Sequence, residues 1–469
     1  MLAGVALASI VACSLLLVVM VADRPSILSP TTHSNFFPGW MAGPLGGLWP
    51  GLTRNSTTLR YLFTGAIVVM YASYLIALRY GPQLRARWII AAIGASQASF
   101  LLAPPLALTD IFNYVNYARM EVVHHLNPYT TIPILEPHSD PSFALSNWHE
   151  LLSPYGPLFT LITFVVAPLG VAGAFWAIKC ILAAAAVASI ALVWRCARML
   201  GRDPVVAIVL VGLNPIVLVW GLGGDHNDFL MMFFILLGFY LLLLGGERER
   251  AGMAELGAGA ALITAAAIKA SAGVLLPVVV VGLLRRPRRL GLCVLGMAGA
   301  SLILGAASLI AFGLHVPDLS TQSELVTSES VPNLIGLALG SGGENTTLHT
   351  LMSAALALAL LLCCLQAYAR GAGRGSLVAA DRLLSACGWA SVALLVTLSW
   401  VLPWYVLWVL PFAALSSSRR LRGAALLLGA YLIIAWAPAS GLLWNAVGFH
   451  PEKTSLGRLH QRYVKELLN

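Results

Sequence analysis

The sequence predicts an all-α protein that crosses a membrane many times, and three observations lead to this prediction. Of the 469 residues, 59% are hydrophobic and only 10% are charged, whereas soluble proteins carry about 25% charged residues. Apolar runs of about 20 residues, the length that spans a hydrocarbon core of about 30 Å, recur along the chain. Short arginine clusters separate them. We therefore expect a polytopic transmembrane helix bundle without a separate soluble domain.

The apolar runs, taken in order, define the expected crossings. The first is expected to be a retained helix and not a cleaved signal peptide, because no basic stretch precedes it. The run 157–197 is too long for one helix and should cross once in net terms, whereas 253–284 should form a hairpin broken near Lys269. About 13 crossings follow. The runs lie near 2–22, 59–79, 88–108, 157–197, 205–222, 228–245, 253–284, 288–313, 349–369, 384–400, 401–416 and 422–441.

The arginine clusters set the expected orientation. Short basic loops stay on the cytoplasmic side of a membrane, so all six clusters should share that side, with the N-terminus inside and the C-terminus outside. The net charge of +9 then reflects topology and does not indicate a nucleic-acid partner. The clusters are Arg79/Arg85/Arg87, Arg195/Arg198/Arg202, Arg248/Arg250, Arg285/Arg286/Arg288/Arg289, Arg370/Arg374/Arg382 and Arg419/Arg420/Arg422.

The densest polar stretch of the chain covers residues 109–129, on the expected outer side. Thr109 is a suitable helix N-cap, and Asp110 in the first turn would be favoured as a carboxylate by the helix dipole. Apolar residues follow at helical spacing, and Asn127-Pro128 ends the pattern. The stretch predicts a juxtamembrane helix along the outer interface. Taken alone, an acid at a helix start is more often structural than catalytic.

A second polar cluster, Gly-Gly-Asp-His-Asn-Asp at 223–228, is inserted between two strongly apolar runs. Charged groups at membrane depth are expensive and are therefore usually functional or paired. The alternative is a simple turn that connects two helices. Asp225, His226 and Asp228 could also bind a divalent cation, but their spacing matches no strong metal template. We expect no metal site, with a divalent cation as the alternative.

Three further features place cationic and aromatic side chains near the same side. Lys269 interrupts an apolar run, so it either reaches an interface or binds an anion, for example a phosphate shared with Arg119. Tyr155, in Ser-Pro-Tyr-Gly-Pro-Leu, and Trp404 and Tyr405, in Pro-Trp-Tyr, lie at the expected outer edge. Aromatic belts explain such residues without a ligand, although sugars also stack on aromatic rings.

The order of these motifs resembles that of the GT-C membrane glycosyltransferases. It is most similar to the actinobacterial polyprenol-phosphomannose-dependent α-1,6-mannosyltransferases, over about residues 85–415. Each motif alone is weak, and their ordered combination carries the resemblance. The motifs are Asp110 to Tyr129, Ser-Pro-Tyr-Gly-Pro-Leu at 153–158, Asn-Pro at 214–215, Gly-Gly-Asp-His-Asn-Asp at 223–228, Ile-Lys-Ala at 268–270 and Pro-Trp-Tyr at 403–405.

This resemblance implies a GT-C fold with three parts: N-terminal transmembrane helices over 1–84, a catalytic membrane domain over 85–415, and a last transmembrane helix with the tail over 416–469. Two helices precede the catalytic unit, so the loop that carries Asp110 is not the first in the chain. In this superfamily an acid of the first large outer loop is the catalytic base, and Asp110 matches it by position and by the motif that follows.

The resemblance also implies the substrates. The donor would be a polyprenyl-phosphate sugar, with mannose as the expected sugar, and the acceptor a glycan or glycolipid at the outer face of the plasma membrane. Substrate-binding residues would be Arg119, Asn127, Tyr129, Tyr155, Asp225, His226, Asn227, Asp228, Lys269, Trp404 and Tyr405. Lipid-linked arabinose or glucose as donor remains an alternative, and so does a polytopic lipid or glycan transporter, which would use the same intramembrane charges.

Overall fold

The computed structural model describes residues 1–22, 38–49, 56–106, 110–247, 252–319, 325–369 and 376–450. Within these ranges the chain is helical and contains no strand, which confirms the all-α prediction. The proposed N-cap Thr109, the whole cluster Arg248/Arg250 and two members of the next cluster, Arg370 and Arg374, lie outside the described residues.

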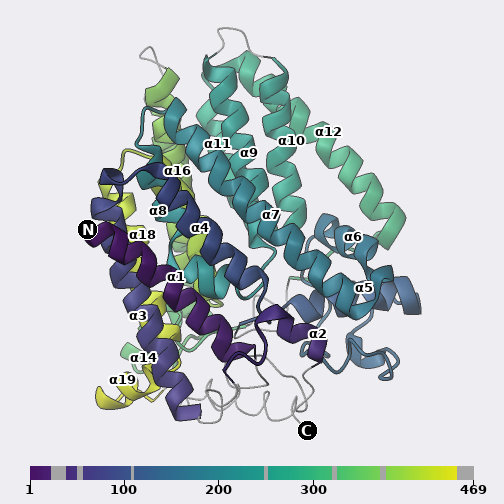
Figure 1. Ribbon diagram of the computed structural model, residues 1–469. Coiled ribbons are helices and arrows are strands. Elements are labelled where there is room, and N and C mark those ends of the chain that lie inside the picture. The colour runs from purple at the N-terminus through teal and green to yellow at the C-terminus, as the bar shows by residue number, and fades with distance from the viewer. Residues whose placement is uncertain are drawn as a thin grey trace.

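The helices form one bundle around a continuous apolar core (Figure 1). The helices are α1 (Leu2–Val21), α2 (Gly39–Ala42), α3 (Ser56–Tyr80), α4 (Ala86–Leu101), α5 (Asp110–His124), α6 (Pro157–Val166), α7 (Gly170–Met199), α8 (Pro204–Gly212), α9 (Asp228–Glu247), α10 (Met253–Ile268), α11 (Leu275–Leu283), α12 (Pro287–Phe312), α14 (Val331–Ala338), α15 (Thr346–Tyr368), α16 (Ser376–Thr397), α17 (Leu410–Leu415), α18 (Arg419–Trp436) and α19 (Ser440–Ala446). Short 3-10 or π turns are η1 (Gly43–Leu45), η3 (Gly81–Gln83), η4 (Pro133–Leu135), η5 (Ala167–Leu169), η6 (Val217–Leu222), η7 (Ala270–Val274) and η8 (Pro403–Trp408).

Seven helices of the described residues are long and apolar enough to cross a membrane, or eight if the bent pair α18 and α19 forms one span. The chain is therefore a multi-pass helical membrane protein, and the number of about 13 crossings stays a prediction. Residues Pro157–Met199 form one such span, made of α6, η5 and α7, in agreement with a single net crossing. The predicted break in 253–284 is present, because α10 ends at Lys269, whose backbone is extended.

Two expected crossings differ from simple helices. The run 205–222 is interrupted because Asn214 and Pro215 end α8, and the Asn214 side chain accepts hydrogen bonds from the next two free backbone N–H groups. The chain then continues as a π-helical turn, η6. The run 401–416 forms η8 and the six-residue helix α17, which together are too short to cross a hydrocarbon core of about 30 Å. Prolines at 403 and 411 account for this break.

Basic clusters from distant parts of the sequence meet at one end of the bundle. Arg202, after α7, forms an ion pair of 2.8 Å with Asp381 in α16, and Asp381 also accepts a hydrogen bond from the backbone of Ser417 just before α18. Arg289, in the first turn of α12, donates to the Leu242 carbonyl in α9. In Figure 1 this end is uppermost, where α9, α10, α11 and α12 gather, whereas α5 lies toward the opposite end, beside α6.

Candidate active site

Asp110 begins α5 and meets the second polar cluster directly. Its carboxylate Oδ2 lies 2.9 Å from Nδ1 of His226, and 16% of the Asp110 side chain is exposed while His226 is buried. The backbone before α5 is tied to the same turn, because the Leu106 N–H donates to the Gly223 carbonyl. The two motifs, more than a hundred residues apart in sequence, therefore converge on one partly open point.

Stacking on Trp404 holds the His226 ring in place. The two ring centroids are 3.4 Å apart and the rings are nearly parallel. The approach to Asp110 has ion-pair distance, yet neither ring nitrogen of His226 has a well-aligned hydrogen bond within the described residues. A small rotation of the imidazole would direct its N–H at the Asp110 carboxylate. The pair is electrostatically attractive when the imidazole is protonated.

Asp225, next in the turn, is neutralised by a lysine that the sequence analysis did not single out. Lys179 of α7 donates to both carboxylate oxygens, at 2.9 and 2.8 Å, and both side chains are buried. Asp225 also has a left-handed backbone (φ 57°), a conformation uncommon for residues other than glycine. The ion pair therefore stabilises a strained turn that directs the following His226 toward Asp110. The signal for Lys179 was present, because it is a lone lysine inside an apolar run.

The Asp228 carboxylate accepts hydrogen bonds from three donors, which come from two other segments. The indole N–H groups of Trp404 and Trp408 donate to it at 3.1 and 2.6 Å. Lys269 adds an ion pair of 2.8 Å. The carboxylate is buried, so these donors replace the water that it would otherwise bind. Asp228 thus holds η8 and the break after α10 against the start of α9.

Of the two lysines at the turn, Lys179 is buried and Lys269 is partly exposed to solvent. Its side chain is 22% exposed, and its ammonium lies over the rings of Tyr405 and Trp408, 4.8 and 5.4 Å from their centroids. Those two rings are themselves stacked. An ammonium has three donor hydrogens and the ion pair with Asp228 uses one, so Lys269 can also bind an external anion.

Tyrosines form one wall beside Asp110. The rings of Tyr114 and Tyr155 meet edge to face at 4.7 Å, and the Tyr114 hydroxyl accepts a hydrogen bond from the Asn227 backbone N–H at 3.2 Å. Burial, followed by the nearby negative charge of Asp110, raises the pKa of the Tyr155 phenol well above its ordinary value. Gly156 then donates its N–H to the Ile268 carbonyl, which ties this wall to the Lys269 break.

The Asn227 side chain is, beside the His226 ring, a second group of the turn without a hydrogen-bond partner in the part of the chain that the structure describes. It is only 1% exposed, and neither its amide nitrogen nor its oxygen has a hydrogen-bond partner among the described residues. A buried polar group without a partner is costly. Its position beside the Asp110–His226 pair makes it a suitable group for binding a hydroxyl that enters the site.

Three of the expected binding residues hold the loop that follows α5 instead of contacting the turn. Asn127 caps a local turn by accepting from the Tyr129 N–H and donates to the Phe312 carbonyl at the end of α12. The Tyr129 hydroxyl bonds to the Tyr155 carbonyl and lies 3.0 Å from the Thr160 hydroxyl. Arg119 lies nine residues beyond Asp110 on the same helix, about 13 Å along its axis.

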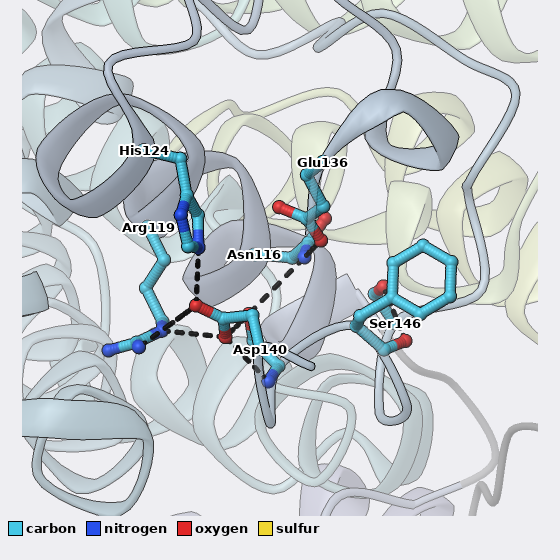
Figure 2. A network of polar contacts seen from close by, with 8 residues as sticks. Asn116, Arg119, His124, Glu136, Asp140 and Ser146 are labelled. Atoms are coloured by element: carbon cyan, nitrogen blue, oxygen red, sulfur yellow. Dashed lines mark hydrogen bonds and ion pairs between the residues drawn. The ribbon is translucent and has the colours of Figure 1, made fainter. Parts of the chain in front are cut away.

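Arg119 belongs to a separate network, shown in Figure 2. Its guanidinium makes a bidentate pair with Asp140, and His124 approaches the same carboxylate at 2.8 Å. Burial alone would raise the pKa of Asp140, but hydrogen bonds from Arg119, Ser142 and His124 outweigh it and hold that pKa well below the usual range. The structure thus places Arg119 in the loop network and Lys269 at the turn, and does not bring them together around one phosphate.

A divalent cation at the turn would compete with two lysines. Asp225 and Asp228 each carry a lysine ammonium within 2.9 Å, and a metal would have to displace both. No group of three or more His, Cys, Asp or Glu side chains is arranged to hold a metal ion in the part of the chain that the structure describes.

Comparison with known proteins points to one family. A family model described as alpha-(1->6)-mannopyranosyltransferase, N-terminal domain, matches residues 25–285. An alpha-(1->6)-mannopyranosyltransferase A of Mycobacterium tuberculosis is 29% identical over 371 residues, 73% of this chain and 68% of that protein. A second protein of that organism, alpha-(1->6)-mannopyranosyltransferase Rv1459c, is 28% identical over 399 residues, 70% of this chain and 65% of that protein.

A shorter match links the chain to Corynebacterium glutamicum. Its alpha-(1->6)-mannopyranosyltransferase A is 30% identical over 187 residues, 38% of this chain and 36% of that protein. The chain thus spans about two thirds of the length of the two longest-matching relatives. No solved structure matches the chain at comparable significance.

Proposed function

Because this chain belongs to the alpha-(1->6)-mannopyranosyltransferase family, whose model covers residues 25–285, we propose that it transfers mannose from a polyprenyl-phosphate donor to a glycan or glycolipid acceptor. The transfer proceeds with inversion at the outer face of the plasma membrane. The observation that carries the proposal is the 2.9 Å approach of Asp110 to His226, which joins the two polar motifs at one partly exposed point.

Asp110 is the catalytic base in this proposal. Asp225 and Asp228 are buried and each is neutralised by a lysine, whereas Asp110 is partly exposed and faces a histidine. A general base must reach the proton that it removes, and exposure gives Asp110 that access. His226, fixed by Trp404, orients the carboxylate and stabilises its negative charge until the proton arrives.

Lys269 supports a lipid-phosphate donor. Its ammonium is partly exposed and keeps donor hydrogens for a phosphate oxygen. A donor held in this way brings its leaving group with it, so the outer face needs no nucleotide site, in agreement with the lack of a phosphate-binding loop motif in the sequence.

The reaction balances with these groups. Asp110 takes the proton of an acceptor hydroxyl while that oxygen bonds to the anomeric carbon. The bond from the anomeric carbon to the phosphate oxygen breaks, and polyprenyl phosphate leaves with the electron pair, through an oxocarbenium-like state. Lys269 stabilises the charge that develops on the phosphate. Attack from the opposite face converts a β-linked donor into an α-glycoside.

The charge distribution supports the orientation. The arginine clusters gather at the end of the bundle away from Asp110, and short basic loops face the cytoplasm. This distribution supports an exterior position for the Asp110 site, where a lipid-linked sugar is the donor that the membrane itself can supply.

A transfer assay tests the proposal. Membranes that contain the full chain are supplied with radiolabelled polyprenyl-phosphate mannose, or in parallel with the arabinose or glucose counterpart, and product glycan is measured. Asp110→Asn should reduce transfer by a factor of about 10² to 10⁴ at normal protein levels. The matched control is Asp203→Asn at the N-cap of α8, where asparagine caps equally well, and it should leave transfer unchanged.

Near-normal turnover by Asp110→Asn would remove Asp110 as the base. Preference for the arabinose or glucose donor would change the sugar while keeping the reaction class. Transfer of none of the three sugars, with lipid or glycan movement across the membrane instead, would favour the transporter.

A further inference from the structure

A cavity that is partly open to solvent lies at the basic end of the bundle, away from Asp110. It is formed where α9 and α11 end and where α12 and α16 begin. Its lining residues are Met199, Phe239, Leu242, Leu243, Gly246, Gly282, Leu283, Arg286, Arg289, Leu377, Ala379, Ala380, Leu383 and Leu384. The wall is thus apolar except for two arginines.

The cavity and the candidate active site occupy opposite membrane surfaces. Helix α9 contributes Asp228 to the active site and Gly246 to the cavity, 18 residues apart. At 1.5 Å per residue the separation is about 27 Å, close to the thickness of a hydrocarbon core. The cavity extends along α9 from Phe239, inside the apolar span, to Gly246 near the end of that helix.

The two arginines differ in what they bind. Arg289 is committed to the protein, because it donates to the buried Glu255 carboxylate at 2.8 Å and to the Leu242 carbonyl at 2.6 Å. Arg286 has no ion pair or side-chain hydrogen bond among the described residues, although it is partly buried. Burial and the positive charge of Arg289 lower the pKa of Arg286. An anion between them would relieve this repulsion.

We propose that this cavity binds an anionic phospholipid of the basic-side leaflet, with its phosphate on the Arg286 guanidinium and an acyl chain against the leucines of α9 and α16. Guanidinium groups bind phosphate through two parallel hydrogen bonds. Basic pockets between transmembrane helices on the cytoplasmic side are suited to anionic headgroups. The apolar wall explains why a lipid, and not free phosphate, fits. The proposal is independent of the transfer reaction.

The test uses the purified full chain in neutral detergent after removal of native lipid. Dioleoylphosphatidylglycerol is titrated in, and retained lipid is measured by native mass spectrometry, with dioleoylphosphatidylcholine and inorganic phosphate in separate arms. Arg286→Gln should weaken binding of the anionic lipid about tenfold, the effect of losing one charge-assisted contact. Arg288→Gln, an exposed neighbour with the same change of charge, should not.

A second variant tests the cavity without changing charge. Ala380→Phe fills the space beside the α16 leucines, so it should also weaken lipid binding while the Arg286 guanidinium stays in place. Equal binding of the two lipids would overturn the proposal, because the charge would then be irrelevant. Equal losses for Arg286→Gln and Arg288→Gln would do the same by pointing to general surface charge. Full competition by inorganic phosphate would show an anion site without a lipid.

Discussion

Glu136, in the loop that follows α5, should make the protein less stable as the pH rises from 5 to 8. Its side chain meets the Asn116 amide (Figure 2), and the residue is only 4% exposed. Glu136 Oε2 and Asn116 Oδ1 are both buried without a hydrogen-bond partner among the described residues. A proton on Glu136 would join these two oxygens, so that acid and amide form two hydrogen bonds. Asp140 and Arg119 also face the acid and act on it in opposite directions.

The magnitude follows from the pKa. Burial raises the pKa of Glu136 to about 7 from its ordinary 4.5, although the Asn116 hydrogen bond lowers it in part. The folded state therefore holds the proton more tightly, and stability is complete below pH 4.5 and is lost as pH rises through 7. The difference corresponds to about 3 kcal/mol at 1.36 kcal/mol per pH unit. At about 2.1 cal/mol/K of unfolding entropy per residue, this is about 3 °C for a chain of this length.

Glu136→Gln tests this reasoning, because glutamine presents the same donor and acceptor as the protonated acid at every pH. Melting temperatures of the variant and the parent protein in detergent should agree at pH 5 and differ by about 3 °C at pH 8, with the variant higher. The other titrating groups, including His124 and Asp140, are common to both proteins and cancel in the difference. A constant difference between pH 5 and pH 8, or a variant that melts lower at pH 8, would refute the account.

Three more substitutions probe the frame of the site. Lys179→Met leaves Asp225 as an unpaired buried carboxylate, so we expect a loss of about 3–5 kcal/mol, seen as a lower melting temperature and recovered by adding Asp225→Asn. Gly156→Ala places a methyl group 2.2 Å from the Ala267 carbonyl oxygen, so melting temperature and transfer should both fall; unchanged values would mean that the segments separate freely. Trp404→Phe keeps the stacked ring but loses the indole N–H, so it should cost about 1–2 kcal/mol, and Trp404→Ala more, by the same thermal assay.

Much of the fold follows from local sequence properties. Apolar length identifies the long helices, and the extended Lys269 after α10 lies where the lysine interrupts an apolar run. The interruptions at Asn214-Pro215 and at Pro403 were not predicted, because apolar composition does not distinguish a full crossing from a short helix. Only the packed structure shows that α17 has six residues.

The sequence predicted which motifs form the site, but not which side chains pair with one another. Asp110 and the 223–228 turn are recognisable because polar groups inserted between apolar helices are usually functional or paired. The packing of distant segments determines which charged side chains pair. Lys179 pairs with Asp225, 46 positions away in the sequence. Arg119 pairs with Asp140 and not with an external phosphate. The sequence marks Lys179 as a lone lysine inside an apolar run, but it does not identify the partner of either cation.

The Asp228 carboxylate links the order of synthesis to the completeness of the site. Two of its three donors come from residues 176 and 180 positions further along the chain. While the ribosome is still making the segment before η8, α9 is present in the membrane with this acid only partly compensated, and His226 has no ring to stack on. In a chain that stops short of η8, Lys269 alone would therefore compensate this buried carboxylate.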